Sequence, residues 1–174
     1  MKRNKTIQKI HGAYYTMGLQ SPDEIITVSK LTKVAGIARN TFYSYYNNLP
    51  DLVYRLENEL LEPIFKLSKR SYSAPITEED LAKIISYCQE NAEKIHLIRY
   101  APHNTFLEKL NRMLNRIFTQ YMEINQIPYT DFQKFAVLCI ISSILIPSTI
   151  HPEQQDAGIL AAEFIDLFKC IFLN

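Results

Sequence analysis

Apolar residues recur at helical spacing along almost the whole chain, and no segment alternates between apolar and polar residues as a strand does. The prolines lie mostly between the helical runs or at their starts, where a missing backbone amide is tolerated. We therefore predict an all-α protein. The expected helices cover residues 3–18, 28–35, 39–46, 50–71, 77–92, 94–100, 103–125, 130–147 and 154–172.

The composition argues against several classes of protein. The four glycines are too far apart to build a phosphate-binding loop, so we expect no nucleotide cofactor. The four histidines include no pair at the spacing that a helical metal site requires, and we predict no metal. Spacing alone leaves a Ser-His-Asp triad open, but Ser142 and Ser143 lack the glycine-flanked elbow of a hydrolase. We expect a protein that is not an enzyme.

The same sequence favours a cytoplasmic location. The three cysteines are odd in number and set among apolar residues, which indicates neither a disulfide framework nor a metal cluster. The basic start is not followed by the apolar core of a signal peptide. The longest apolar stretch, 135–146, is shorter than the roughly 20 residues that cross a bilayer. We expect no association with a membrane.

Charge is distributed unevenly between the two parts of the chain. Residues 1–48 carry seven basic and two acidic side chains, a net charge of +5, and residues 49–174 carry twelve basic and sixteen acidic ones, a net charge of −4. A basic head suits a nucleic-acid partner, because cationic side chains release counterions from the phosphate backbone. The alternative is a solvated basic helix without a partner.

The last two expected helices, 130–147 and 154–172, are apolar around nearly their whole circumference. A surface helix would present a wide polar face instead. The chain has little further material to cover both helices, so we predict that they form the interface of a homodimer. The alternative is a central helix pair inside a monomer.

Residues 27–52 have the pattern of a helix-turn-helix. Two short helices are separated by a glycine-led turn at residues 36–38, which suits this motif. Phe42 and Tyr46 lie four residues apart and are expected to face inward. On the first helix, the residues expected to face inward are Val28, Leu31, Val34 and Ala35.

The outward residues of the second short helix have the chemistry of a DNA-reading surface. They are Arg39, Asn40, Thr41, Tyr43 and Tyr45. Each can bond to base edges or phosphate oxygens, and no carboxylate among them would repel the DNA backbone. This composition is typical of a helix that enters the major groove.

At this point the segment resembles a known family. Residues 34–46, Val-Ala-Gly-Ile-Ala-Arg-Asn-Thr-Phe-Tyr-Ser-Tyr-Tyr, followed by Asp51-Leu52, are similar to the DNA-binding signature of TetR-family transcriptional regulators. The signature covers about residues 5–56. The resemblance implies a three-helix DNA-binding domain at 1–48 and a helical effector-binding and dimerisation domain at 49–174. It also implies a dimeric repressor that a small-molecule effector releases from a pseudo-palindromic operator in duplex DNA.

The resemblance also assigns roles to single residues. It implies that Thr27 contacts a phosphate, that Ser29 and Lys30 face the DNA, and that Arg39, Asn40 and Thr41 enter the groove. Tyr43 and Tyr45 would hold the backbone or base edges. Two features depart from the family: Leu49 stands where a phosphate-binding lysine is usual, and the connection from Leu19 to Ile26 is longer than is common.

The middle of the chain contains candidates for an effector pocket, because a pocket combines an apolar wall with a few polar groups. Core packing is the alternative role at each position. The candidates are Phe65, Tyr87, Cys88, Asn91, Phe106, Leu110, Met113 and Cys139.

A second function class is compatible with the same fold. The chain would then be a helical interaction protein or coactivator that no longer reads DNA. Such a protein has no need of outward DNA-reading groups, and the residues 39–45 therefore favour the DNA-binding regulator.

Overall fold

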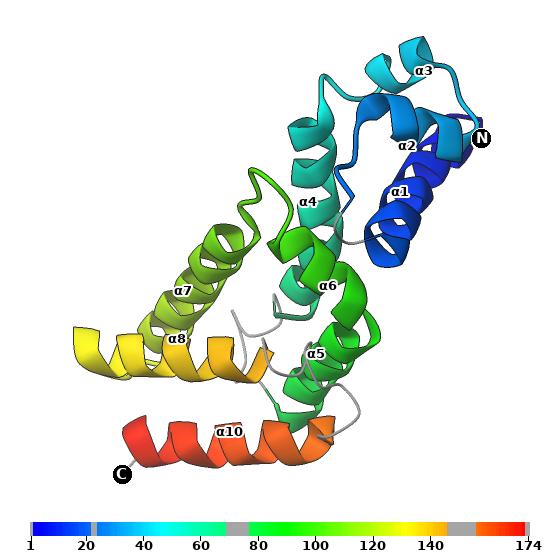
Figure 1. The fold of residues 1–174 in the computed structure, drawn as a ribbon. Helices are drawn as coiled ribbons and strands as arrows, with labels where there is room; N and C mark the ends of the chain where they lie inside the picture. The colour runs from blue at the N-terminus through cyan, green and yellow to red at the C-terminus, as the bar shows by residue number, and fades with distance from the viewer. Residues whose placement is uncertain (1, 22–23, 69–76, 146–155, 173–174) are drawn as a thin grey trace. The chain divides into compact units, whose positions relative to one another are not determined.

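The computed structural model describes residues 2–21, 24–68, 77–145 and 156–172, and this part of the chain contains helices and no strand. The all-α prediction is therefore confirmed for the described residues (Figure 1). In chain order, the helices are α1 (Lys2–Gln20), α2 (Val28–Ala35), α3 (Arg39–Tyr43), α4 (Leu49–Ser68), α5 (Glu78–Glu90), α6 (Ala92–Arg99), α7 (Phe106–Ile124), α8 (Asp131–Leu145) and α10 (Ala157–Phe172).

Most helix boundaries agree with the predicted ones to within a few residues. The largest difference in the motif is that α3 ends at Tyr43 instead of continuing to residue 46. The Ser44 hydroxyl donates to the Asn40 carbonyl at 2.9 Å, and the Ser44 amide donates to the same carbonyl at 3.0 Å. The Tyr45 amide then donates to the Phe42 carbonyl, only three residues back, at 2.9 Å, and this tightened turn ends the helix.

The first compact unit contains the residues up to Glu59 together with Leu97–Phe106. Within it, α1 packs against α2, and α2 packs against α3. A Cβ atom added at Gly18 of α1 would lie 2.5 Å from the end of the Leu97 side chain, so a larger residue there would require Leu97 to shift. The fully or almost fully buried side chains include Ile10, Tyr14, Leu31, Phe42, Tyr46, Leu52 and Leu56.

A buried carboxylate joins α4 to the 97–106 segment inside this first unit. Glu57 is 1% exposed and accepts hydrogen bonds from the backbone amide and the hydroxyl of Thr105. A buried carboxylate is stable only when such donors replace its hydration. The sequence alone did not group residues 97–106 with the helix-turn-helix, because a hydrogen bond over 48 residues leaves no periodic signal.

The second compact unit contains Leu60–His96 and the chain from Leu107 onward. Helix α5 begins with a capping box, in which Thr77 and Asp80 each bond to the other's backbone amide. Helix α10 packs against α5 and α8. The buried apolar residues of the second unit recur at helical spacing along α5 and α7. They are Leu81, Ile84, Ile85 and Cys88 on α5, and Leu110, Leu114, Phe118 and Met122 on α7.

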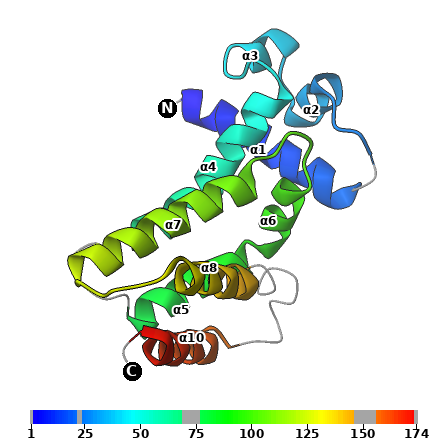
Figure 2. The same ribbon diagram turned by 90° about the vertical axis from the view of Figure 1, so that its left-hand side faces the viewer.

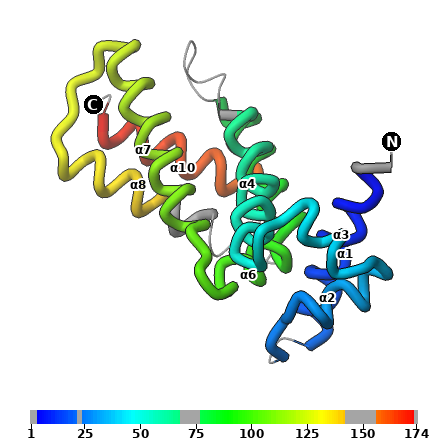
Figure 3. The backbone as a smooth tube through the Cα atoms, turned by 90° about the horizontal axis from the view of Figure 1, so that it is seen from above, coloured from blue at the N-terminus to red at the C-terminus, as the bar shows by residue number. Residues whose placement is uncertain are grey.

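Helices α8 and α10 lie side by side and run in opposite directions (Figures 1 and 2). The chain reverses between α7 and α8, as the tube in Figure 3 shows, and Gln126 adopts a positive φ of 54° at this reversal. Aromatic rings then join α10 to α7, with Phe118 and Phe172 at 5.8 Å and Tyr121 and Phe168 at 5.8 Å between ring centroids. The first pair is tilted and the second is edge-on, and aromatic contacts of these kinds stabilise the unit beyond simple burial.

The described residues contain neither a candidate membrane span nor a candidate metal cluster. None of the described helices combines the length and the apolar character needed to cross a bilayer. In the same part of the chain, no group of three or more histidine, cysteine or acidic side chains is placed to hold a metal ion.

Candidate nucleic-acid interface

The turn of the helix-turn-helix is fixed by Gly36. Its φ of 63° lies in the left-handed region, where any residue with a Cβ atom is strained. The Gly36 amide donates to the Lys33 carbonyl, and the Ile37 amide donates to the Thr32 carbonyl at 3.0 Å. These two bonds form a Schellman motif, which ends α2 and sets the path of the chain into α3.

Helix α2 begins at Val28, as the sequence predicted, and Thr27 is its N-cap residue. The Thr27 side chain accepts a hydrogen bond from the Lys30 amide at 3.3 Å, which satisfies a free donor of the first turn. The side chains of Thr27, Ser29 and Lys30 are all exposed, as a surface facing DNA requires.

One inward residue of α2 was predicted wrongly. Val34 is 52% exposed, and the buried positions of this helix are Leu31, Thr32 and Ala35. Thr32 is acceptable in the core because its hydroxyl donates to the Ser29 carbonyl at 3.2 Å. The apolar pattern favoured valine over threonine for the inner face, but the rotation of the helix places the threonine there.

Helix α3 separates an apolar core side from a polar outer side within five residues. Phe42 is fully buried, and its ring meets the Tyr46 ring at a centroid distance of 5.5 Å. Arg39 and Asn40 are exposed, Thr41 is half-buried, and Tyr43 is 55% exposed. The structure thus places four of the five predicted DNA-reading groups, all except Tyr45, on one short helix.

Tyr45 follows the helix and is half-buried. It lies in the turn that leads from α3 toward α4, instead of on the helix itself. Its amide donates to the Phe42 carbonyl at 2.9 Å. A role in holding the DNA backbone remains a prediction for this residue.

His11 is a positioning residue that sequence reasoning did not identify. Its Nε2 lies 2.7 Å from the Tyr46 hydroxyl, and its Nδ1 lies 2.8 Å from a Glu59 carboxylate oxygen. Burial lowers the pKa of His11, although Glu59 acts in the opposite direction. The neutral ring fits this arrangement, because Nδ1–H can donate to Glu59 while Nε2 accepts from the Tyr46 hydroxyl. His11 of α1 therefore joins Glu59 of α4 to Tyr46, which lies between α3 and α4.

The start of α4 is held by a network around Asp51. The Asp51 carboxylate accepts from the Asn47 amide at 2.9 Å, and this hydrogen bond lowers the pKa of Asp51. Arg55 lies 3.3 Å from Asp51 and covers the face of the Tyr46 ring at 5.3 Å. Leu49, in place of the family's usual lysine, is half-buried and brings no charge to this end of the surface.

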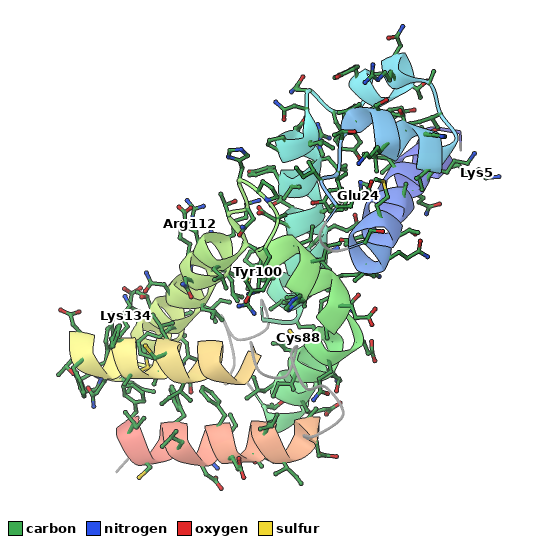
Figure 4. The ribbon with its side chains drawn as sticks, viewed as in Figure 1. Lys5, Glu24, Cys88, Tyr100, Arg112 and Lys134 are labelled. Carbon is green, nitrogen blue, oxygen red and sulfur yellow. The ribbon has the colours of Figure 1, made fainter. Side chains whose placement is uncertain are left out.

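Lys30, a predicted DNA contact, forms an ion pair within the protein. Lys30 Nζ lies 2.6 Å from a Glu24 carboxylate oxygen and 3.5 Å from the Ile25 carbonyl. Four further basic side chains of the same unit are exposed: Lys5, Lys9, Lys33 and Arg39. Figure 4 labels Lys5 and Glu24.

The eight candidate pocket residues divide between the two units. Phe106 belongs to the first unit, and the other seven belong to the second. Cys88 and Leu110 are buried, and burial raises the pKa of the Cys88 thiol to about 12. Cys139 is exposed. The remaining four of the seven, Phe65, Tyr87, Asn91 and Met113, are half-buried.

Gln120 of α7 was not among the candidates, although it has the property of a ligand-binding group. Its side-chain oxygen is buried and has no hydrogen-bond partner in the described part of the chain. A buried acceptor without a donor costs free energy, which a bound donor would recover. Sequence reasoning missed it because a glutamine among charged residues on a helix resembles an ordinary surface position.

Large apolar side chains lie exposed on the two helices expected to form a dimer. On α8, Phe132 is 78% and Phe135 is 65% exposed. On α10, Ile159 and Leu167 are exposed. Residues 146, 147, 154 and 155 of the predicted segments lie outside the described residues.

Comparisons with known proteins rest on structure. No family model matches the sequence, and no curated protein matches it. The FadR regulator of Bacillus subtilis, solved with stearoyl-CoA, matches with a TM-score of 0.65 and 19% identity over 92% of this chain and 96% of its own. NalD of Pseudomonas aeruginosa, the secondary repressor of the MexAB-OprM multidrug efflux pump, matches with a TM-score of 0.62 and 14% identity, covering 97% and 98%.

A TetR-family transcriptional regulator of Mesorhizobium loti matches with a TM-score of 0.62 and 10% identity, covering 99% of this chain and 98% of its own. All three similar proteins are transcriptional regulators rather than enzymes. Because their identities are low, the similarity concerns the fold. Together with the helix-turn-helix geometry of α2 and α3, it shows that this chain has the fold of TetR-type transcriptional regulators.

Proposed function

We propose that this protein is a dimeric transcriptional regulator that binds duplex DNA through α2 and α3 and responds to a small-molecule effector. The observation that carries the proposal is the outer side of α3. It places Arg39, Asn40 and Tyr43 in solvent beside a fully buried Phe42, and α3 contains no acidic residue. A surface with these groups offers donors to base edges and phosphates and no charge that repels DNA.

The proposed dimer rests on α8 and α10. Exposed phenylalanines on a helix that already packs on one side within its own chain are unfavourable in water, and burying them against a second copy would remove that cost. An isologous contact between two copies also supplies the two-fold symmetry that a pseudo-palindromic operator requires.

The proposed effector site lies in the second unit. FadR of Bacillus subtilis was solved with stearoyl-CoA, which makes effectors with a long acyl chain a reasonable first class to test here. The buried thiol of Cys88 and the unpaired oxygen of Gln120 fit a site with an apolar wall and a single polar anchor. Repression, with release by the effector, is the mode of action that we propose.

Selection of bound duplexes from a random pool tests the proposal. The wild-type protein should enrich one pseudo-palindromic sequence, and Asn40→Ala should enrich it less because a base-edge contact is lost. Asn115→Ala, at an exposed position of α7, is the matched control and should enrich the same sequence as the wild type. If the wild-type protein enriches no sequence, the chain is not a DNA-binding regulator.

A further inference from the structure

The connection between α1 and α2 carries a feature that DNA binding alone does not explain. In residues 1–48, the only acidic residues are Asp23 and Glu24, and both lie on this connection. Asp23 lies outside the described residues. Glu24 is described, and its carboxylate lies 2.6 Å from Lys30 Nζ, which the family resemblance assigns to the DNA surface.

The geometry makes Glu24 a substitute for a phosphate oxygen. A lysine ammonium has three donors, and Lys30 directs two of them back at Glu24 and the Ile25 carbonyl. Both side chains of the pair are about half exposed, so neither is locked in place by packing. A charge-assisted hydrogen bond to a carboxylate uses the same donor and the same charge that a DNA phosphate would need.

We infer that Glu24 competes with the DNA backbone for the Lys30 ammonium and thereby lowers the protein's affinity for all duplexes. This inference rests on the proposed DNA-binding function. When DNA binds, either the Lys30 ammonium leaves Glu24 for a phosphate or the phosphate meets a pair whose charge is already neutralised. In both cases, one cation of the surface contributes less than its full charge. Glu24 lies on the connection from Leu19 to Ile26, which is longer than is common in the family that the sequence resembles.

The effect concerns the backbone and leaves the base contacts unchanged. Phosphate contacts position the protein and carry no sequence information, so Glu24 weakens binding to operator and to other duplexes by the same factor. It sets how tightly the protein is held on DNA at a given salt concentration, while the residues of α3 set which sequence it prefers.

A double-mutant cycle on Glu24 and Lys30 tests the inference. Affinities for a selected duplex and for a scrambled duplex are measured by fluorescence anisotropy between about 50 and 200 mM salt. Glu24→Gln should bind both duplexes about two- to five-fold more tightly, since exposed ion pairs have modest strength. The slope of log affinity against log salt should become steeper by up to about one unit, because one further phosphate is neutralised.

The double variant Glu24→Gln with Lys30→Gln separates the competition from simple repulsion between Glu24 and DNA. The tightening should disappear when Lys30 is absent. If it persists in full in the Lys30→Gln background, Glu24 acts on the DNA directly and the inference is wrong. It is also wrong if Glu24→Gln binds as the wild type does.

Glu79→Gln is the matched control, because Glu79 forms an exposed pair of the same length, 2.6 Å, with Lys83 in the second unit. It removes the same charge and should leave DNA affinity unchanged. Equal tightening in this control would mean that net charge alone is responsible, which would overturn the role of Glu24. If the wild type and every variant fail to prefer the selected duplex, the proposed DNA-binding function itself is wrong, a result distinct from an unchanged Glu24→Gln.

Discussion

Two surfaces of the chain differ in polarity. The surface of α2 and α3 is polar, whereas the surface of α8 and α10 exposes large apolar side chains. On α3, a buried phenylalanine is followed directly by an exposed tyrosine, and the outer positions are polar. On α8, two phenylalanines lie in solvent. Polar groups that keep their donors free suit a hydrated, charged partner, whereas exposed aromatic rings suit a dry contact with another protein. The difference supports the proposal that α2 and α3 bind DNA and that α8 and α10 bind a second copy.

The largest expected effect separates the two sides of α3. Phe42→Ala should lower the free energy of unfolding by about 3–5 kcal/mol, because it empties a fully buried site. Tyr43→Ala, one residue further, should change it by less than about 0.5 kcal/mol, because that side chain is largely exposed. Urea unfolding followed by circular dichroism measures both values. Equal losses would mean that α3 does not divide core from surface as described.

The next effect concerns the apolar surface of α8. Phe135→Glu should weaken the proposed dimer by at least about 2 kcal/mol for each copy of the residue, and a two-fold interface contains the residue twice. Light scattering across a dilution series measures the dissociation. Asn115→Glu on α7 is the control for the added charge and should remain dimeric. A wild-type protein that is monomeric at micromolar concentration would contradict the proposed dimer.

A smaller effect is expected for the DNA-reading residues. Tyr43→Ala should weaken binding to the selected duplex by about 1–3 kcal/mol and relax the preference at one base position. Lys5→Gln should instead weaken binding to all duplexes alike and reduce the salt slope by about one unit. Anisotropy titrations on matched and scrambled duplexes distinguish these two patterns. Identical behaviour of the two variants would contradict the division between base reading and backbone contact.

The smallest effect is a pH dependence of stability in the first unit. Burial lowers the pKa of His11 below its ordinary value of 6.5, so the unfolded chain binds a proton that the folded protein does not. The contribution of His11 to stability is complete above pH 6.5 and is lost as the pH falls through that value toward the folded pKa. Thermal unfolding should therefore show a loss of stability on acidification that is smaller in His11→Gln. A His11→Gln variant that loses as much stability on acidification as the wild type would contradict this assignment.

The fold and the outer residues of the motif could be predicted from the sequence, whereas the contacts that support the motif could not. Helical periodicity and the glycine at the turn are local signals, and the structure places both as expected. The contacts of His11 with Tyr46 and of Glu57 with Thr105 join residues 35 and 48 positions apart, and no local pattern announces them. Local patterns also failed at Val34. The apolar valine was expected to be buried, but Thr32, whose hydroxyl bonds within its own helix, occupies the inner face instead.

Hydroxyl-radical footprinting of the selected duplex tests the central claim, that two copies of this chain read DNA through α3, most directly. The account predicts two protected segments related by a two-fold axis, with centres about 34–36 Å apart, one helical turn of the duplex. Phe135→Glu should weaken both protections together, and Tyr43→Ala should weaken them without altering the fold. A single protected segment, or protection without any preferred site, would contradict the account.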